Sequence, residues 1–368
     1  MARRSSLFLF VVGLVSGVWT GCGADSDGDG DGSGDPGADV GGGGGDGGGG
    51  GSPDGCEPPA GAEIVMPWTA FPDEDNMTGP CYGLITDGTL LYVNMRDRIV
   101  TVPLNGGTAT EVFRSPEEIP VLLTMWADTD RIVFNDNGDW YELPYGGAPV
   151  PATVPVQFAN TIFDFDPATD TFYAADEDFV DDNIDLVSAV VGEATPTVLA
   201  SDLTVGLGRE WVRSGDRFYT QESQNDDFTA GRSVYVINLG DAAPTALELT
   251  PPPFNLVGAT SAALYYASSE DPSTWGVYRV AHGGGSPERI WDTVFFGGLG
   301  GVQSATDRLY GNDATNLWRI TDGQDLALIA QVPVQGCTTH EVLAHEGFVY
   351  TVTFNDDDGT NQIWRVAE

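Results

Sequence analysis

One pattern recurs along the chain at intervals of 40 to 46 residues, and it limits the folds that this sequence can adopt. Each copy is an aliphatic or aromatic residue followed by a second apolar residue, in most copies tyrosine. A period near forty residues, with several short strands in each repeat, is typical of β-propeller blades. We call these pairs the anchors, and they are Leu91-Tyr92, Ile132-Val133, Phe172-Tyr173, Phe218-Tyr219, Leu264-Tyr265, Leu309-Tyr310 and Val349-Tyr350.

A second short apolar segment follows every anchor and is expected to pair with it as a neighbouring strand. These segments are 99–102, 140–143, 187–190, 234–237, 277–280, 317–320 and 363–366. Glycine-containing turns follow most of them, as in Asn105-Gly-Gly107, and glycine supplies the positive φ that tight hairpins require. A fourth strand is expected after each turn, for example at 110–113. No stretch has a convincing helical period, so we predict little helix.

The repeat therefore predicts an all-β fold, a single seven-bladed propeller over residues 59–368, with six or eight blades as alternatives. Six repeats include a fourth strand, but the seventh stops at Glu368 without one. Before the first anchor, residues Ala62 to Met66 have a similar apolar pattern. We expect them to pair with the segment 363–366 and so to close the ring without leaving an open edge.

The first 21 residues have the features of an export signal peptide. Arg3 and Arg4 precede an apolar run from Leu7 to Trp19, which is too short to act as a membrane-spanning helix. The run ends in Thr20-Gly21-Cys22, which resembles the bacterial lipobox. This resemblance implies a lipoprotein with diacylglycerol on Cys22; simple secretion with a nearby cleavage site is the alternative. Because Gly23 stands where inner-membrane lipoproteins carry Asp, the resemblance favours a lipid anchor in the outer membrane.

Residues 22–58 are dominated by glycine and aspartate, with runs of five glycines at 41–45 and 47–51. Such a segment cannot bury enough apolar surface to offset its backbone entropy. We therefore expect a disordered, self-repelling linker between the lipid anchor and the propeller.

The chain is strongly acidic, with a formal net charge of −40 from 55 acidic and 15 basic residues. Nucleic acid is an unsuitable partner because its binding needs a basic surface that releases counterions. Cations and partners with basic patches suit this charge. We expect a monomer that contacts the membrane through its lipid and binds an unidentified protein or glycan.

Many of the carboxylates lie between an anchor and the strand that follows it, in loops that the blade topology places on one face. Only Arg96, Arg98 and Arg232 accompany 18 acidic residues there. Clustered aspartates suit Ca²⁺, which takes six to eight oxygen ligands; acidic loops that only keep the protein soluble are the alternative. The candidate calcium ligands are Asp176, Asp178, Asp181, Asp182, Asp356, Asp357 and Asp358.

Cys56, Cys81 and Cys337 remain if Cys22 carries the lipid, and an exported chain encounters an oxidising compartment. Cys81 and Cys337 both precede the innermost strand, in the first and the last blade. Those blades are neighbours once the ring closes, so we predict a Cys81–Cys337 disulfide and leave Cys56 over.

No catalytic motif is evident, so we expect a non-enzymatic binding or interaction module. The stretch from His340 to His345 has one residue too many for the zinc motif H-E-x-x-H, and we place both histidines on a strand. His282, next to a glycine-rich turn, is expected to be a solvated hairpin residue. The alternative is a propeller enzyme, lyase- or hydrolase-like, with its site in the central funnel.

The stretch from Leu91 to Gly107 and its counterpart from Val277 to Gly285 carry a family resemblance. They look like blades of the TolB-like and YVTN/NHL-type propellers of exported bacterial lipoproteins, and the similarity spans roughly residues 60–368. The resemblance implies the fold. It implies no function, because one fold hosts many activities, and it identifies no catalytic residue in this chain.

The lipid anchor predicts how the protein distributes on cell fractionation. Cys22→Ser should move the protein from the membrane fraction to the soluble fraction, because no acceptor for diacylglycerol remains. Partition of the variant with membranes to the same extent as the parent would contradict the anchor.

Overall fold

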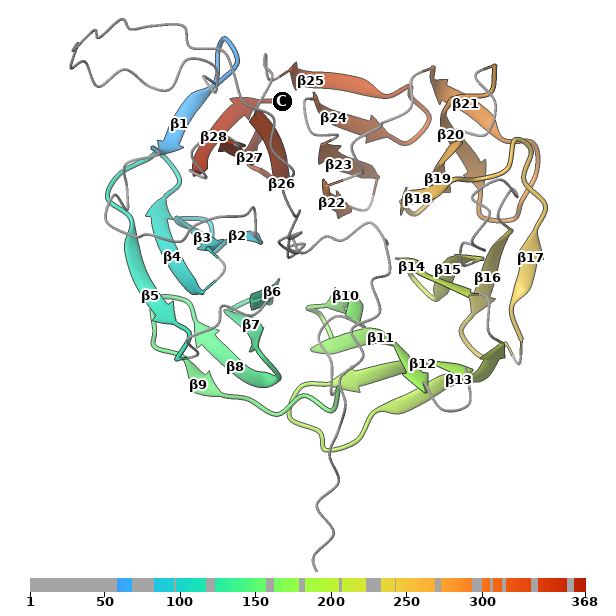
Figure 1. The fold of residues 1–368 in the computed structure, drawn as a ribbon, viewed down its shortest axis with the longest axis horizontal. Helices are drawn as coiled ribbons and strands as arrows, with labels where there is room; N and C mark the ends of the chain where they lie inside the picture. Colours follow the sequence, from blue (N-terminus) through green and yellow to red (C-terminus); the bar gives the residue numbers. More distant parts are fainter. Residues whose placement is uncertain are drawn as a thin grey trace, which may run out of the picture.

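The computed structural model shows a ring of seven sheets, each of four antiparallel strands, around a central axis (Figure 1). This is the seven-bladed β-propeller that the repeat predicts. The structure describes residues 58–67, 83–95, 97–116, 123–156, 162–178, 183–204, 207–222, 233–241, 243–268, 273–292, 300–304, 307–312, 316–331, 337–355 and 361–368.

Each blade is numbered in chain order, and its four strands run from the central axis outward. Blade 1 contains β2 (Leu84–Thr86), β3 (Leu90–Asn94), β4 (Arg98–Pro103) and β5 (Thr110–Arg114). Blade 2 contains β6 (Leu123–Ala127), β7 (Arg131–Asp136), β8 (Asp139–Pro144) and β9 (Val150–Pro151). Blade 3 contains β10 (Ile162–Asp166), β11 (Thr171–Asp178), β12 (Asn183–Val190) and β13 (Thr197–Thr204). Blade 4 contains β14 (Leu207–Ser214), β15 (Arg217–Glu222), β16 (Val234–Asn238) and β17 (Thr245–Leu247).

The remaining blades repeat this order, and in the last one the outer strand comes from the N-terminal side of the chain. Blade 5 contains β18 (Asn255–Ala259), β19 (Ala263–Ser268), β20 (Gly276–Ala281) and β21 (Glu288–Trp291). Blade 6 contains β22 (Gly300–Ser304), β23 (Arg308–Asn312), β24 (Asn316–Thr321) and β25 (Ala327–Gln331). Blade 7 contains β26 (Cys337–His345), β27 (Phe348–Asn355), β28 (Asn361–Ala367) and β1 (Glu63–Met66).

All seven anchors lie in the second strands, and their two residues face opposite sides of the blade because strand side chains alternate. The first residue packs against the preceding blade and the second against the next. At the junction of blades 1 and 2, Tyr92 contributes to the same buried cluster as Ile132 and Phe134. Seven such clusters form, one at each blade junction.

β1 closes the ring as the sequence predicts. Glu63 lies opposite Arg365, Ile64 opposite Trp364 and Met66 opposite Ile363. Val65 and Met66 are 1% and 2% exposed and belong to the cluster that joins blades 7 and 1. The closing blade therefore has four strands like the others, although its strands come from the two ends of the propeller.

A close approach at Gly106 fits the closing strand against blade 1. Gly106 has φ +84° in the β4–β5 hairpin, and a Cβ atom there would lie 3.3 Å from the Ile64 carbonyl oxygen. Arg365 adds polar contacts around this approach, because its guanidinium donates to Glu63 at 2.6 Å, to the Leu104 carbonyl at 3.0 Å and to Asn105 at 2.8 Å.

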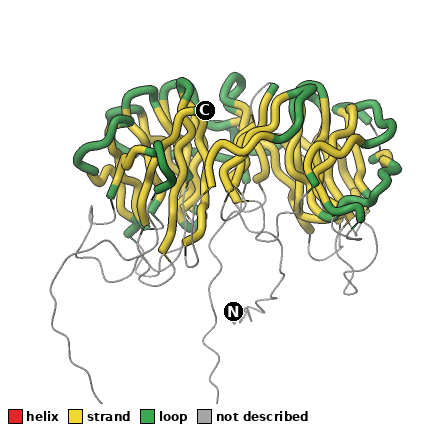
Figure 2. The backbone as a smooth tube through the Cα atoms, turned by 90° about the horizontal axis from the view of Figure 1, so that it is seen from above, coloured by secondary structure: helices red, strands yellow, loops and turns green. Residues whose placement is uncertain are grey.

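The propeller has two faces that differ in their connections. The turn face carries the turns between first and second strands and the hairpins between third and fourth strands, with Glu368 on the same side (Figure 2). The loop face carries the loops between second and third strands and the segments that connect consecutive blades. β1 runs antiparallel to β28, so the chain enters β1 on the turn face, next to the β4–β5 hairpin. In the described residues no helix is long and apolar enough to cross a membrane.

Removal of the closing strand should destabilise the whole ring. Deletion of residues 59–67 exposes the apolar cluster under Val65 and Met66 and leaves β28 as an open edge, so we expect an aggregated or much less stable protein. Two such buried side chains contribute on the order of 3 to 6 kcal/mol. Thermal unfolding measures the effect, and deletion of residues 24–54 is the control that should not change it. An unchanged melting temperature after the first deletion would contradict the closure.

Candidate functional site

On the turn face, a polar contact crosses every one of the seven blade junctions. Most of these contacts begin at the second anchor residue, a tyrosine, and reach the next blade. Tyr92 accepts a hydrogen bond from the Gly146 amide at 3.2 Å, and Tyr310 donates to Glu368 at 3.0 Å. At the closing junction, Arg365 lies 3.5 Å from the Tyr350 hydroxyl and reaches the β4–β5 hairpin of blade 1. The seven contacts form a polar ring outside the apolar junction clusters.

Two junctions illustrate how charge and burial are combined in this ring. Tyr265 donates to Asp322 at 2.8 Å, and burial together with this carboxylate raises the pKa of Tyr265 to about 12, so its hydroxyl keeps its proton. Tyr173 packs under the Arg213 guanidinium, 4.0 Å from the ring centre, while Arg213 donates to Asp164 at 2.8 Å. A cation stacked on an aromatic ring and paired with a carboxylate is held by both interactions.

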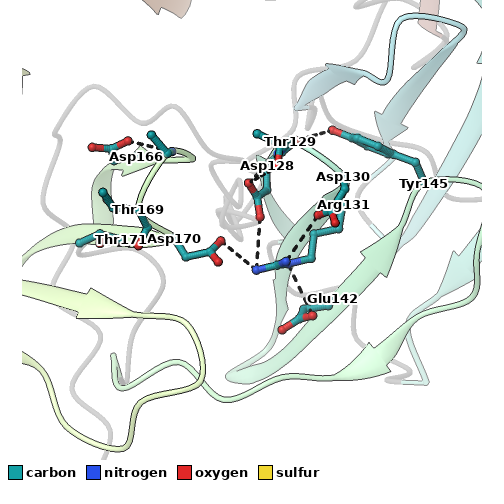
Figure 3. A network of polar contacts seen from close by, with 11 residues as sticks. Asp128, Thr129, Asp130, Arg131, Glu142, Tyr145, Asp166, Thr169, Asp170 and Thr171 are labelled. Atoms are coloured by element: carbon teal, nitrogen blue, oxygen red, sulfur yellow. Dashed lines mark hydrogen bonds and ion pairs between the residues drawn. The ribbon is translucent and has the colours of Figure 1, made fainter.

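The junction of blades 2 and 3 lacks the anchor tyrosine, because Val133 takes its place. There the guanidinium of Arg131 makes the junction contact (Figure 3). It pairs with Asp170 of blade 3 at 2.8 Å and with three carboxylates of its own blade. These are Asp128 at 3.2 Å, Asp130 at 3.5 Å and Glu142 at 3.5 Å.

Four carboxylates around one guanidinium leave an excess of negative charge, and Asp170 responds to it. Burial and the hydrogen bond with Asp128 raise the pKa of Asp170, whereas Arg131 lowers it. Asp170 also has φ +53°, a conformation that asparagine and aspartate tolerate better than most residues.

The described residues contain no group of three or more His, Cys, Asp or Glu side chains suited to hold a metal ion. The carboxylates around Arg131 are therefore assigned to the blade junction, where their charge is opposed by an arginine. Nothing in their geometry indicates an ion site.

His282 is part of the junction of blades 4 and 5, and the expectation of a solvated hairpin residue is wrong. Its Nδ1 lies 2.6 Å from the Tyr219 hydroxyl, its Nε2 lies 2.8 Å from the Thr260 carbonyl oxygen, and its ring stacks on Tyr219. The sequence missed this role because the partners are far away along the chain.

Ser214 lies close to His282, a combination that can form a nucleophile and its base. The Ser214 hydroxyl donates to the Thr260 carbonyl at 2.7 Å, and His282 Nε2 contacts the same oxygen. A carbonyl only accepts, so Nε2 carries a hydrogen and cannot take the serine proton. This geometry makes the Ser214–His282 contact structural.

The predicted calcium ligands fall mostly outside the described residues. Asp176 is exposed on β11, opposite Asp185, and Asp178 lies at the end of the same strand, where the structure does not describe its side chain. Asp181, Asp182, Asp356, Asp357 and Asp358 lie outside the described residues. Calcium binding therefore stays a prediction.

Two of the 18 acidic residues counted near the loop face do not add exposed, unbalanced charge to it. Asp97 is paired with Arg98 at 2.8 Å and with Arg114 at 3.5 Å, so its charge is balanced locally. Asp136 is 3% exposed and accepts from the Ser115 hydroxyl at 2.9 Å. By contrast, Asp139 and Asp176 are exposed.

The predicted lipid and disulfide sites are not described by the structure. Cys22, Cys56 and Cys81 lie outside the described residues, and Cys337 begins β26 with an undescribed side chain. His340 and His345 both lie on β26, the strand on which they are expected.

Glu341 lies on the innermost strand of blade 7. Among the described residues of the innermost strands, its pKa departs most from the usual value. Burial raises its pKa to about 8, and its carbonyl accepts from the Thr351 hydroxyl at 2.8 Å.

The fold and the junction contacts define a seven-bladed β-propeller protein. No protein-family model matches the sequence, and no curated protein matches it. Among solved structures, it is similar to PorZ, a bacterial surface component of the type-IX secretion system of Porphyromonas gingivalis. The TM-score is 0.51 at 16% identity, over 80% of this chain and 39% of PorZ, so the chain spans about two fifths of that protein.

An oligogalacturonate lyase solved in complex with manganese is similar over 76% of this chain and 86% of its own, with a TM-score of 0.52 at 10% identity. A putative TolB from Agrobacterium tumefaciens is also similar, over 71% of this chain and 94% of its own, with a TM-score of 0.43 at 16% identity. TolB propellers are thus among the similar structures. At such identities the likeness shows the fold alone.

The Arg131 contacts predict a stability difference that depends on pH. Asp170→Asn should raise the melting temperature near pH 7.5, because it removes one of four negative groups and an amide can donate to Asp128. The raised pKa means that ionisation of Asp170 costs stability as pH rises, so the gain should vanish below about 3.8, where the Asp170 carboxyl is protonated in the folded and in the unfolded chain.

Asp170 is 38% exposed, so we expect a gain of less than about 1 kcal/mol, or up to about 3 °C. Thermal unfolding at pH 3 and pH 7.5 measures the effect. Asp130→Asn is the matched control, since Asp130 is 77% exposed and should shift the melting temperature little. The same gain at both pH values would argue against the charge explanation.

Proposed function

We propose that this chain is a lipid-anchored, non-enzymatic binding module of the bacterial cell envelope, held at the outer membrane through Cys22. Its loop face is the binding surface, and its partners are cationic: a protein with a basic patch, or Ca²⁺ bound by the acidic loops.

The entry of the chain into β1 on the turn face is the observation that carries this proposal. A lipid-anchored linker that ends there brings the turn face toward its point of attachment, and the loop face lies on the opposite side of the disc. The ends of the second strands and the starts of the third strands then lie on the side away from the anchor. The sequence places 18 carboxylates in this region, and the structure buries one of them, Asp136. This orientation leaves the acidic loops accessible to a partner.

The placement of the arginines supports a cationic partner. In the described part of the chain, eight arginines form ion pairs with carboxylates of the protein itself. On the turn face these pairs lie in or beside the blade junctions, while carboxylates such as Asp216, Asp325 and Glu346 remain exposed. Because these arginines are paired within the protein, the electrostatic potential around it is negative. Such a potential attracts cations and repels anions.

The calcium part of the proposal is tested by thermal unfolding of the exported chain without its signal peptide. A ligand that binds only the folded state stabilises it by about 2.7 kcal/mol at a hundredfold excess over its dissociation constant. Millimolar Ca²⁺ should therefore raise the melting temperature more than Na⁺ at the same ionic strength.

Two triple variants test which face of the propeller binds Ca²⁺. A loop-face triple variant, Asp356→Asn, Asp357→Asn and Asp358→Asn, should lose most of the calcium effect. A turn-face triple variant, Asp216→Asn, Asp325→Asn and Glu346→Gln, removes the same number of charges and should keep it. Equal shifts with Ca²⁺ and Na⁺ would leave only charge screening and would contradict calcium binding.

A further inference from the structure

Three buried side chains near the loop face hold the segments that connect consecutive blades. Asp136, at the end of β7, accepts from the Ser115 hydroxyl at 2.9 Å, in the connection from blade 1 to blade 2. Trp140 on β8 donates to the Val156 carbonyl at 3.2 Å, in the connection from blade 2 to blade 3.

The third side chain does the same between blades 4 and 5. Gln221 on β15 donates to the Phe254 carbonyl at 3.2 Å, just before β18 begins. Gln221 is 1% exposed, Asp136 3% and Trp140 7%. All three side chains therefore lie inside the disc, and their bonds reach outward to segments at the loop face: Trp140 and Gln221 bond to backbone carbonyls, and Asp136 bonds to a serine hydroxyl.

The position of Gln221, two residues after the anchor tyrosine, carries a buried amide in three further blades. Asn94 and Asn135 are 3% exposed and Asn312 is fully buried. Asn135 accepts from the Gly138 amide at 3.0 Å, in the turn between β7 and β8, which also belongs to the loop face. The same strand position thus supplies a polar side chain where the strand meets a loop.

A polar group in an apolar junction is costly unless it is hydrogen-bonded, whereas leucine or methionine would fill the same volume without that cost. The junction clusters already supply apolar packing. The contacts explain the polar choice, because the bonds tie segments at the ends of the strand ladders to the interior of the blades.

We infer that Asn135, Asp136, Trp140 and Gln221 are positioning residues of the loop face: Asn135 fixes the β7–β8 turn, and the other three fix segments that connect blades, in one arrangement before a partner binds. The inference rests on the proposed function for its purpose. A surface whose backbone is ordered in advance loses less conformational entropy on binding, which favours a defined cationic partner.

Hydrogen exchange of single backbone amides tests the inference directly. In Gln221→Met, which keeps the volume and removes the donor, exchange of the Phe254 amide should be about five- to tenfold faster, as expected for loss of one hydrogen bond. This amide donates to the Ala267 carbonyl at 2.7 Å and so reports opening of the segment. Ser115→Ala is a second, milder variant, read at the Ser115 amide, which donates to the Asp97 carbonyl at 2.7 Å.

Tyr310→Phe is the control on the opposite face, because it removes only turn-face hydrogen bonds, the one donated to Glu368 and the one accepted from Arg308. It should leave exchange at positions 254 and 115 unchanged. Unchanged exchange in both Gln221→Met and Ser115→Ala would overturn the inference, and so would the same increase in Tyr310→Phe, which would indicate general loosening.

The rise in melting temperature that Ca²⁺ causes, measured on the same variants, connects the inference to binding. If the parent protein responds to Ca²⁺, Gln221→Met should weaken the response at least about threefold more than Tyr310→Phe does; an equal effect would overturn the link to binding. If the parent shows no response, the calcium proposal fails, and the exchange results still decide whether these residues position the loop face.

Discussion

The packing of each blade against both neighbours is the interaction on which the rest of the structure depends. In every second strand, one side chain faces the preceding blade and the next faces the following blade, so a blade cannot bury its apolar surface alone. The requirement is satisfied only when the last blade meets the first. At that junction Tyr350 and Val352 share a cluster with Leu91 and Val93, the same arrangement as at the other junctions.

Polar contacts on the turn face follow from this packing and limit the cost of a net charge of −40. Several of the arginines lie at the junctions, where Arg131 pairs with carboxylates of two blades and Arg213 pairs with two carboxylates of the preceding blade. Arg365 illustrates this use of charge, because it contacts Glu63 of β1 and the hairpin of blade 1 at once. The arginines thus help to fasten the ring, and the uncompensated carboxylates remain at the surface.

The same topology separates attachment from recognition in the function that we propose. Tight turns and hairpins occupy the face where the chain enters β1, and their polar groups are engaged between blades. Longer loops and connections occupy the other face, supported from inside by side chains such as Asp136 and Gln221. A rigid ring that supports irregular segments on one side is a general way to build a binding surface.

The sequence by itself determined the number of blades, the strand order within them and the closing role of residues 62–66. These features are encoded in local apolar patterns and in a spacing that can be read along the chain. The tertiary structure decided the side-chain contacts between blades. His282 contacts Tyr219 across 63 residues, and Arg365 contacts Glu63 across 302. No local pattern marks such partners, so a histidine expected in solvent lies in a junction and an aspartate counted on an acidic face is buried. Periodic burial is a property of neighbouring residues, whereas hydrogen bonds between blades depend on which turns the closed ring brings together.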